Sequence, residues 1–394
     1  MRRLRIFYAA HPSPNAVAFP ESQLWRQNLY APLVDLGHEV VELDYDLTPH
    51  FQNLDPSKPT QRAFIEEHRP RLEAELLRQI ETAHRERPID VFFSYFYSAC
   101  ARPEVVREIG RLGITTVNWY CNGAHQFHLV EQIAPAYDFC LVPEKFRLDD
   151  YRRIGANPIY SQEAANPNVY RPYPLPLEFD VVFVGQRYGD RPHYLRRLLD
   201  AGVAVRVWGS GWAAASGPAG GNGAATATAT TPPLGDRLRA LTRPEGWRAL
   251  GQRLRGTPTA ATPSLPPELC GPPLSDEELV RMYSRARISL GFSTTGETHT
   301  ARERIVQVRL RDFEAPMSGA FYMVESMPEL EEFFEIGREI VCYDGPDDLV
   351  EKARYFLGHD DERERIRQAG RARALRDHTW HRRFEIVFEK MGLG

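Results

Sequence analysis

The sequence has few cysteines, no long apolar run and almost no excess of either charge, and each scarcity excludes a class of protein. Its 394 residues include 5 cysteines, an odd number without a C-x-x-C pair, so neither a disulfide framework nor a zinc site is expected. No apolar stretch approaches the ~20 residues that a spanning helix requires. Lys and Arg number 49 against 53 Asp and Glu, a net charge of −4 that argues against a nucleic-acid partner. These features predict a cytoplasmic protein with reduced thiols and no bound metal.

The remaining composition is that of ordinary globular protein. Hydrophobic residues make up 42% of the chain and charged residues 26%, and the mean hydropathy is −0.44. At about 150 residues per domain, this length predicts two to three domains, each able to bury a core.

Strand-like and helix-like segments alternate along the chain. In the first part, apolar runs that predict strands lie at 4–10, 38–43, 89–97, 114–120 and 138–142. Amphipathic segments that predict helices lie between them, at 21–36, 61–87 (interrupted by Pro70) and 104–112. A second series begins with the apolar strand 180–185 and includes expected helices at 276–285 and 300–317. Strands that alternate with helices predict βαβ units and parallel sheets.

A proline-rich segment separates the two series. Residues 166–179 contain four prolines and predict a stiff linker. We expect an N-terminal Rossmann-like domain at 1–165, a C-terminal Rossmann-like domain at 180–375 and a final helix at 376–394. Open α/β sheets bind ligands at the carboxyl ends of their strands, so we expect both sheets to face a central cleft.

An insertion at 213–273 interrupts the second domain. Residues 213–233 are rich in Ala, Gly and Thr and are expected to be disordered, because they offer little apolar surface to bury. Residues 234–256 place arginines around leucines and a tryptophan. This basic amphipathic stretch predicts either a solvated helix or a weak contact with a membrane surface, and both interpretations stay open.

The segment 309–321 is the most informative about chemistry. It places an acid, Glu314, on a helix that is followed by a glycine and an apolar strand. A carboxylate so placed accepts hydrogen bonds from two adjacent hydroxyls, as on a ribose. The amino end of the expected helix, near 301–304, offers free N–H groups for a diphosphate. The alternative is a surface helix on which Arg311 pairs with Glu314 at helical spacing.

The loop 185–191 offers two arginines directly after the first strand of the second domain. Arg187 and Arg191 are suited to neutralise phosphate oxygens through forked donation. The alternative is that both arginines lie on a solvated face.

Several short motifs, taken in order, resemble the CgeB-like (spore-maturation type) glycosyltransferases. The motifs are Phe183–Gly185, Trp208–Trp212, Arg311–Ala315, Phe334–Ile340 and His378–Phe384. These glycosyltransferases are relatives of the group 1 retaining glycosyltransferases of GT-B fold. The resemblance covers residue 180 to the C-terminus apart from the insertion, and it implies an α/β GT-B fold with two Rossmann-like domains facing a central cleft.

The resemblance also implies a donor site in the C-terminal domain for a nucleotide-diphosphate sugar, which serves as co-substrate, with no other cofactor. Glu314 matches the acid that holds the ribose, and Arg187 and Arg191 match a basic pair at the diphosphate. Further expected donor contacts are Gly185, Gly209, Ser210, Thr295, Gly296 and Arg311. A second acid, two helical turns before Glu314, is missing, since Val306 and Gln307 stand there.

The implied reaction is glycosyl transfer with retention and without a metal ion, to a glycan, lipid-linked or protein acceptor. Asn122, His125 and His128 follow the strand at 114–120 and are the expected acceptor-side catalytic residues, although a loop histidine is more often structural. Three alternatives stay open: a metal-dependent GT-A enzyme using Asp44-Tyr45-Asp46, a GT-B-fold epimerase, and a degenerate binding protein. A nicotinamide oxidoreductase is disfavoured, because no glycine fingerprint follows the first strand.

Overall fold

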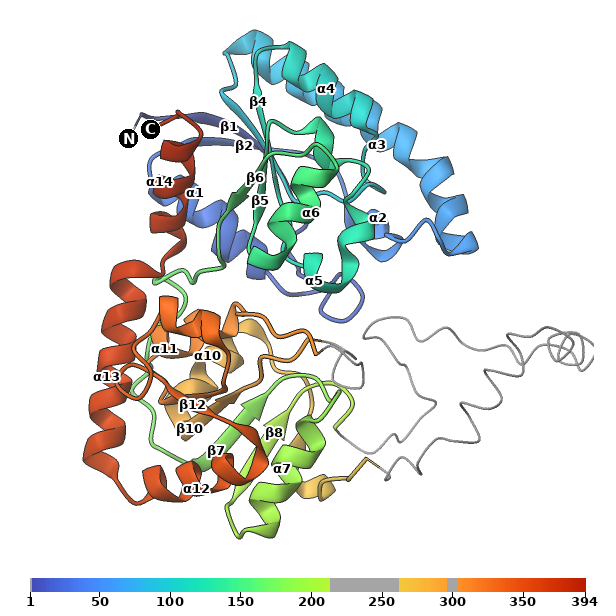
Figure 1. Ribbon diagram of the computed structural model, residues 1–394. Coiled ribbons are helices and arrows are strands. Elements are labelled where there is room, and N and C mark those ends of the chain that lie inside the picture. Colours follow the sequence, from blue (N-terminus) through green and yellow to red (C-terminus); the bar gives the residue numbers. More distant parts are fainter. Residues whose placement is uncertain (1, 213–261, 296–303) are drawn as a thin grey trace, which may run out of the picture.

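The computed structural model describes residues 2–212, 262–295 and 304–394, which form two α/β domains stacked end to end (Figure 1). Each domain contains one sheet of six strands. The stretches 213–233 and 234–256, and with them the expected donor contact Gly296, lie outside the described residues.

The first sheet has the order β2-β1-β3-β4-β5-β6, and every neighbouring pair is parallel, as predicted. Its strands are β1 (Arg5–Ala9), β2 (Glu39–Glu42), β3 (Val91–Ser94), β4 (Thr115–Trp119), β5 (Phe139–Val142) and β6 (Pro158–Tyr160). The central strand β3 is buried along its whole length, as expected for a parallel sheet covered on both faces.

Helices flank this sheet. They are the π-helical turn η1 (Arg26–Tyr30), α1 (Ala31–Asp35), α2 (Thr48–Gln52), α3 (Pro59–Glu86), α4 (Pro103–Arg111), α5 (Gly123–Gln126) and α6 (Leu148–Arg153). The interruption expected at Pro70 was wrong, because α3 continues through it. Pro70 and Glu66 are both exposed, so water can solvate the Glu66 carbonyl that proline leaves without its helical partner.

The second sheet has the order β12-β11-β10-β7-β8-β9 and is also parallel. Its strands are β7 (Phe179–Val184), β8 (Val205–Trp208), β9 (Cys270–Gly271), β10 (Ala286–Gly291), β11 (Tyr322–Glu325) and β12 (Val341–Tyr343). Its helices are α7 (Arg191–Asp200), α10 (Asp276–Arg285), α11 (Arg311–Met317), α12 (Gly345–Leu357) and α13 (Asp360–Asp377).

The helix expected at 300–317 is shorter than predicted, since α11 begins at Arg311 and residues 304–310 are not helical. The backbone of these residues pairs with the loop after β10 instead: Thr295 N–H donates to the Ile305 carbonyl at 2.8 Å, and Gln307 N–H donates to the Ser293 carbonyl at 3.1 Å. Extended pairing suits the β-branched Ile305 and Val306 better than a helix does.

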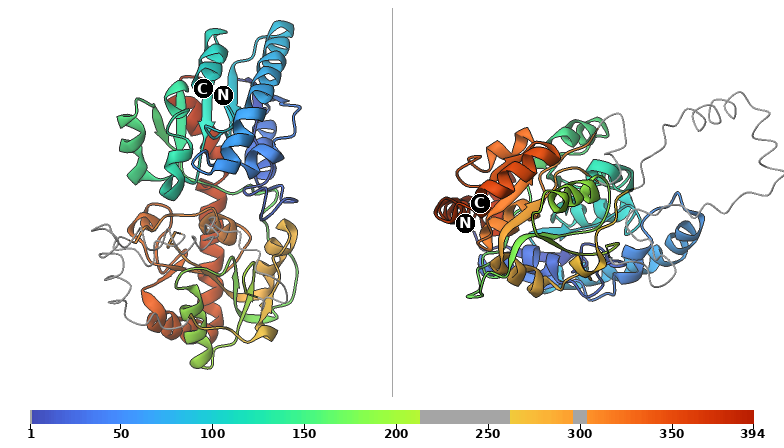
Figure 2. Two further views of the ribbon diagram at one scale, coloured as in Figure 1. Left: turned by 90° about the vertical axis from the view of Figure 1, so that its right-hand side faces the viewer. Right: turned by 90° about the horizontal axis from the view of Figure 1, so that it is seen from below.

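The chain crosses between the domains twice, and the two crossings lie side by side. After α13 the chain returns to the first domain as α14 (Trp380–Lys390), whose Trp380, Phe384 and Phe388 join the core of that domain. Ala165 on the outgoing crossing pairs with this returning segment: its N–H donates to the His378 carbonyl at 3.1 Å, and its carbonyl accepts from Trp380 N–H at 3.3 Å. The chain termini consequently lie close together on the first domain (Figure 2).

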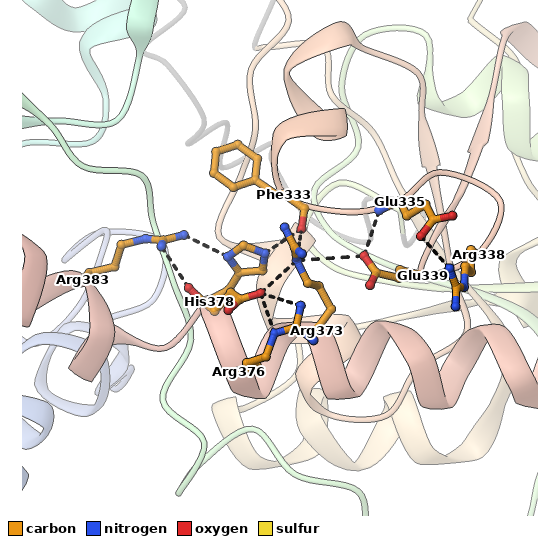
Figure 3. Close-up of polar contacts among 9 residues, drawn as sticks. Phe333, Glu335, Arg338, Glu339, Arg373, Arg376, His378 and Arg383 are labelled. Atoms are coloured by element: carbon orange, nitrogen blue, oxygen red, sulfur yellow. Dashed lines mark hydrogen bonds and ion pairs between the residues drawn. The ribbon is translucent and has the colours of Figure 1, made fainter.

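His378 stands at the junction of α13 and α14 (Figure 3). Its Nε2 is hydrogen-bonded to the Phe333 carbonyl at 2.7 Å, and Arg383 approaches its Nδ1 at 3.2 Å. Burial and the nearby Arg383 lower the pKa of His378 to about 4. The ring is therefore neutral near pH 7, and its two hydrogen bonds stabilise the second crossing between the domains.

Candidate active site

The strand order of the second sheet marks the carboxyl ends of β7 and β10 as a ligand site. From β7 the chain builds outward to β9, then returns to the centre of the sheet at β10. The loops that follow β7 and β10 therefore diverge, and open α/β sheets bind ligands at such a switch point. In the first sheet the corresponding point lies between β1 and β3.

The loops after β7 and β8 bring Gly185, Arg187, Gly209 and Ser210 together. Gly209 has a φ of +142°, and a Cβ there would lie 2.2 Å from the Gly185 carbonyl oxygen, so only glycine fits this approach. Arg187 N–H donates to the Ser210 carbonyl at 3.0 Å. The Arg187 side chain is exposed and makes no ion pair with any described residue, so its guanidinium is available to an anion.

Arg191, by contrast, points into the protein. Its guanidinium lies 3.7 Å from the ring centre of Tyr188, and it donates to the Gln186 carbonyl at 2.9 Å and to the Tyr188 hydroxyl at 2.5 Å. Burial lowers its pKa to about 10. Arg191 lines a cavity of only about 10 Å³ with Thr294, Arg304 and Glu325. That space suits one water, so a diphosphate would reach Arg191 only after side chains move.

Glu325, at the end of β11, organises the loop after β10. One carboxylate oxygen accepts from the N–H groups of Ser293 and Thr294 and from the Thr294 hydroxyl, each at 3.0 Å, and the other pairs with Arg304. Thr295, an expected donor contact, is buried in this loop. The loop is thus held in one shape beside the switch point.

Glu314 is buried rather than exposed, with 1% of its surface accessible. It forms an ion pair with Arg311 at 3.0 Å, which is the pairing of the alternative interpretation, and Tyr170 of the linker lies near it. Its Oε1 has no partner among the described residues. Burial raises the pKa of Glu314, against the opposing effects of Arg311 and Tyr170. The neighbouring Asp312 is committed to the fold, accepting from the Tyr322 hydroxyl at 2.7 Å and from Arg309 N–H at 2.8 Å.

The expected acceptor-side residues lie on and around α5, in the loop after β4. Asn122 donates to the Tyr95 hydroxyl at 3.2 Å. His125 is exposed, and its pKa is lowered first by desolvation and then by the charge of Arg309 from the other domain. His128 is also exposed. The structure therefore brings His125 toward the second domain, whereas Asn122 is occupied within its own.

Two buried carboxyl groups at the carboxyl ends of β5 and β6 escaped the sequence reasoning. Burial raises the pKa of Glu144 to about 7, and burial together with Glu144 and Glu314 raises the pKa of Glu163 to about 8. Glu163 of the first domain lies close enough to Glu314 and Arg309 of the second for their charges to affect its pKa. Glu144 closely follows the predicted strand 138–142, which is the signal that would have found it, whereas no strand was predicted before Glu163.

Arg309 is a third candidate functional residue. It begins the segment 309–321, but the sequence alone assigned it no role. It donates to the Thr294 carbonyl at 2.5 Å, its Nε is buried without a partner, and it forms no ion pair within the described part of the chain. Its charge reaches His125 and Glu163 of the other domain. Arg309 is therefore a cation at the domain interface that forms no ion pair with a carboxylate among the described residues.

The two acids of the Asp44-Tyr45-Asp46 motif lie in the first domain, where each bonds to a neighbouring residue. Asp46 accepts from Thr48 N–H at 2.9 Å at the start of α2, and Asp44 N–H bonds to Gln79. Within residues 2–212, 262–295 and 304–394, no cluster of three His, Cys, Asp or Glu residues is arranged to hold a metal ion.

In the same ranges, no helix is long and apolar enough to span a membrane.

Comparison with known proteins agrees with the two-domain architecture. Residues 191–389 match a family described as glycosyl transferase-like. No curated protein matches the chain by sequence.

Solved structures match over nearly the whole chain at low identity. Sucrose-phosphate synthase from Thermosynechococcus elongatus has a TM-score of 0.55 at 12% identity and covers 100% of this chain and 99% of its own. HepE from Anabaena, solved with UDP and glucose, has a TM-score of 0.53 at 12% sequence identity, and the match covers 99% of this chain and 100% of HepE. A glycosyltransferase from Rickettsia africae has a TM-score of 0.55 at 10% sequence identity, and the match covers 100% of both chains. The expected GT-B fold is confirmed, and the GT-A alternative is wrong.

Proposed function

The chain belongs to the glycosyl transferase-like family, and on that premise we propose that it transfers a sugar from a nucleotide-diphosphate sugar to an acceptor. Within the family, the kinship that we propose is with the CgeB-like enzymes. The Anabaena protein of the same fold, solved with UDP and glucose, supports a nucleotide-sugar donor.

The observation that carries the proposal is the state of Glu314. An acid with 1% exposure and a carboxylate oxygen without a described partner is costly to bury, so it needs a compensating ligand. A carboxylate accepts hydrogen bonds from two vicinal hydroxyls, which a ribose offers. Glu314 belongs to α11, which packs beside β10 and β11 near the switch point.

The leaving diphosphate gains negative charge during transfer, and fixed cations lower the barrier. Arg187 is exposed beside Gly185, Gly209 and Ser210. Arg309 forms no ion pair with a described residue, and its charge acts on His125 of the other domain. We assign these two arginines to the diphosphate, with Arg191 supporting the loop that presents Arg187. The transfer that we propose retains the anomeric configuration and needs no metal ion.

The acceptor side belongs to the first domain in this proposal. His125 is exposed and its pKa is lowered, first by desolvation and then by Arg309; it is suited to orient an acceptor hydroxyl, with Asn122 and His128 beside it. The acceptor is a glycan, a lipid-linked sugar or a protein.

A thermal-shift screen tests the donor proposal, because a ligand that binds the native state raises the melting temperature. UDP-, GDP- or dTDP-linked sugars should raise it, and NAD should not. Glu314→Gln should abolish the shift. Glu351→Gln, which changes an exposed acid on α12, should keep it. A shift with NAD alone would contradict the proposal.

One observation favours a second candidate, nucleotide-sugar binding without transfer. At the position of the missing acid, Val306 is held in a β-bridge with Thr294 and offers no group to a donor sugar. Release of nucleoside diphosphate from a donor sugar, lost in Glu314→Gln, supports transfer or hydrolysis. Tight binding with no release across a broad acceptor panel supports the second candidate.

A further inference from the structure

Two side chains that follow β5 hold one residue of the short helix α5. Glu144 accepts a hydrogen bond from the Ala124 N–H at 3.3 Å, and Arg147 donates to the Ala124 carbonyl at 2.7 Å. The other arm of the Arg147 guanidinium donates to Asp150 at 2.7 Å, which fixes the arginine. The Glu144 carboxyl also lies against Gly123, where an added Cβ would come 3.1 Å from its Oε2. Both main-chain polar groups of Ala124 are therefore bonded to side chains.

A third side chain holds α5 on the other side of His125. Tyr120, directly after β4, donates its hydroxyl to the Gln126 carbonyl at 3.0 Å. Tyr120 and Ala124 are each 1% exposed, whereas the His125 side chain is exposed. Figure 1 shows α5 on the side of the first domain that faces the second. The backbone is thus held before and after a histidine whose imidazole is accessible.

Burying an acid at position 144 is costly. The Glu144 side chain is 3% exposed, and its Oε2 has no hydrogen-bond partner among the described residues. An apolar side chain of similar size would avoid the desolvation of a carboxyl group. Stability alone therefore does not explain the acid, which supplies an acceptor for one N–H group of α5.

The segment that holds α5 also contacts the second domain. Lys145, which lies between the two side chains bonded to Ala124, forms an ion pair with Glu332. The Lys145 ammonium lies 4.9 Å from the ring centre of Tyr160, whose hydroxyl donates to Glu329 at 2.8 Å. Both acids belong to one 3-10 turn of the second domain. The attachment of α5 is thereby placed against that domain.

We propose that Glu144, Arg147 and Tyr120 are positioning residues, which hold α5 so that the His125 imidazole keeps one position facing the second domain. The inference rests on the proposed function for its consequence, since His125 is there assigned to orient the acceptor hydroxyl. It goes beyond that function by naming residues that act through the main chain of α5 without touching the acceptor. Misplacing a reacting group by about 1 Å can cost about a hundredfold in rate.

The experiment is NMR of the full chain labelled with ¹³C and ¹⁵N at its 12 histidines, with the His125 signal identified by its loss in His125→Gln. Glu144→Leu and Glu144→Gln remove the same charge, but only glutamine keeps an acceptor for the Ala124 N–H. The leucine variant should shift and broaden the His125 signal. The glutamine variant should retain the wild-type signal.

A pH titration of the same signal gives a second readout. Desolvation is the main cause that lowers the pKa of His125, followed by the charges of Arg309, His128 and Arg147. These charges are the same in the two Glu144 variants. A released helix is better solvated, so His125 should titrate at higher pH in Glu144→Leu than in Glu144→Gln.

Two buried tyrosines supply a matched pair. Tyr120→Phe removes a bond to the α5 backbone and should broaden the His125 signal. The ring of Tyr151 lies 5.0 Å from that of Phe127, which directly follows α5, but its hydroxyl has no hydrogen-bond partner among the described residues. Tyr151→Phe should therefore leave the His125 signal unchanged.

The wild-type His125 signal in folded Glu144→Leu and Tyr120→Phe variants would overturn the proposal. A purely structural role predicts that result, because it lowers the melting temperature without moving the histidine.

Turnover separates this inference from the proposed function. The kcat for UDP release from UDP-glucose should be roughly tenfold lower in Glu144→Leu than in Glu144→Gln, with the same KM, because the proposed donor site lies on the second domain. Equal kcat values in these variants of an active wild type would contradict the consequence for catalysis. If the wild type releases no nucleoside diphosphate from UDP-, GDP- or dTDP-glucose, the proposed function fails, and the NMR signal still decides whether these side chains position His125.

Discussion

At the scale of single residues, the domain interface concentrates acids in a poorly solvated region. Glu144 and Glu163 come from the first domain and Glu314 from the second, and burial raises the pKa of each. Each acid raises the free energy of the folded state once it ionises, unless a ligand or a cation compensates. Such strain at an interface is typical of functional sites, where pKa values are shifted by neighbours and by burial.

The pH dependence of stability should expose Glu163. Its pKa rises to about 8 in the folded chain, so stability is lost as pH rises from its ordinary range near 4.5 toward 8. Glu163→Gln keeps the size of the side chain and removes the charge. Its gain over the wild type should be near zero at pH 5 and roughly 1–3 kcal/mol at pH 8, as measured by urea unfolding. Equal slopes for both proteins would show that Glu163 is solvated.

At the scale of elements, α14 contributes to a core far from it in sequence. Phe384 is 1% exposed and packs in the first domain, with its ring 5.8 Å from that of Phe93 on β3. A helix at the carboxyl end of the chain thus stabilises the amino-terminal sheet. The sequence predicted a helix at 376–394, but only tertiary contacts show which core it joins.

Truncating Phe384 should therefore destabilise the first domain. Phe384→Ala should cost about 3–5 kcal/mol, the usual range for a buried phenylalanine. Glu389→Ala, on the exposed side of the same helix, should change stability by less than about 0.5 kcal/mol. Denaturant unfolding followed by the fluorescence of the buried Trp25 and Trp119 checks both. A loss confined to the second domain would contradict this assignment of α14.

The boundaries of the helices show which structural features the sequence pattern can predict. The helix predicted at 276–285 is present as α10, and it begins with a capping box between Ser275 and Glu278, whose hydrogen bonds are both local. The start of α11 was misplaced, because the backbone of residues 305–307 pairs with the loop after β10 instead of forming a helical turn. Arg309 and Glu163 were missed because their electrostatic interaction exists only when the two domains meet.

At the scale of the whole molecule, contacts at opposite sides of the interface hold the domains together. Ser22 donates to Asp276 at 2.9 Å, Tyr160 donates to Glu329 at 2.8 Å, and Lys145 pairs with Glu332. The parallel sheets and the GT-B fold were predictable from periodicity and motif order. The closed arrangement of these side chains was not, because it depends on how two separate cores dock.

The most direct test of the central claim is a crystal structure of the full chain with UDP bound. The account predicts the two ribose hydroxyls on the Glu314 carboxylate and the diphosphate between the loops after β7 and β10, within reach of Arg187 and Arg309. A nucleotide seated on the first domain, or anywhere away from the carboxyl ends of the second sheet, would contradict it.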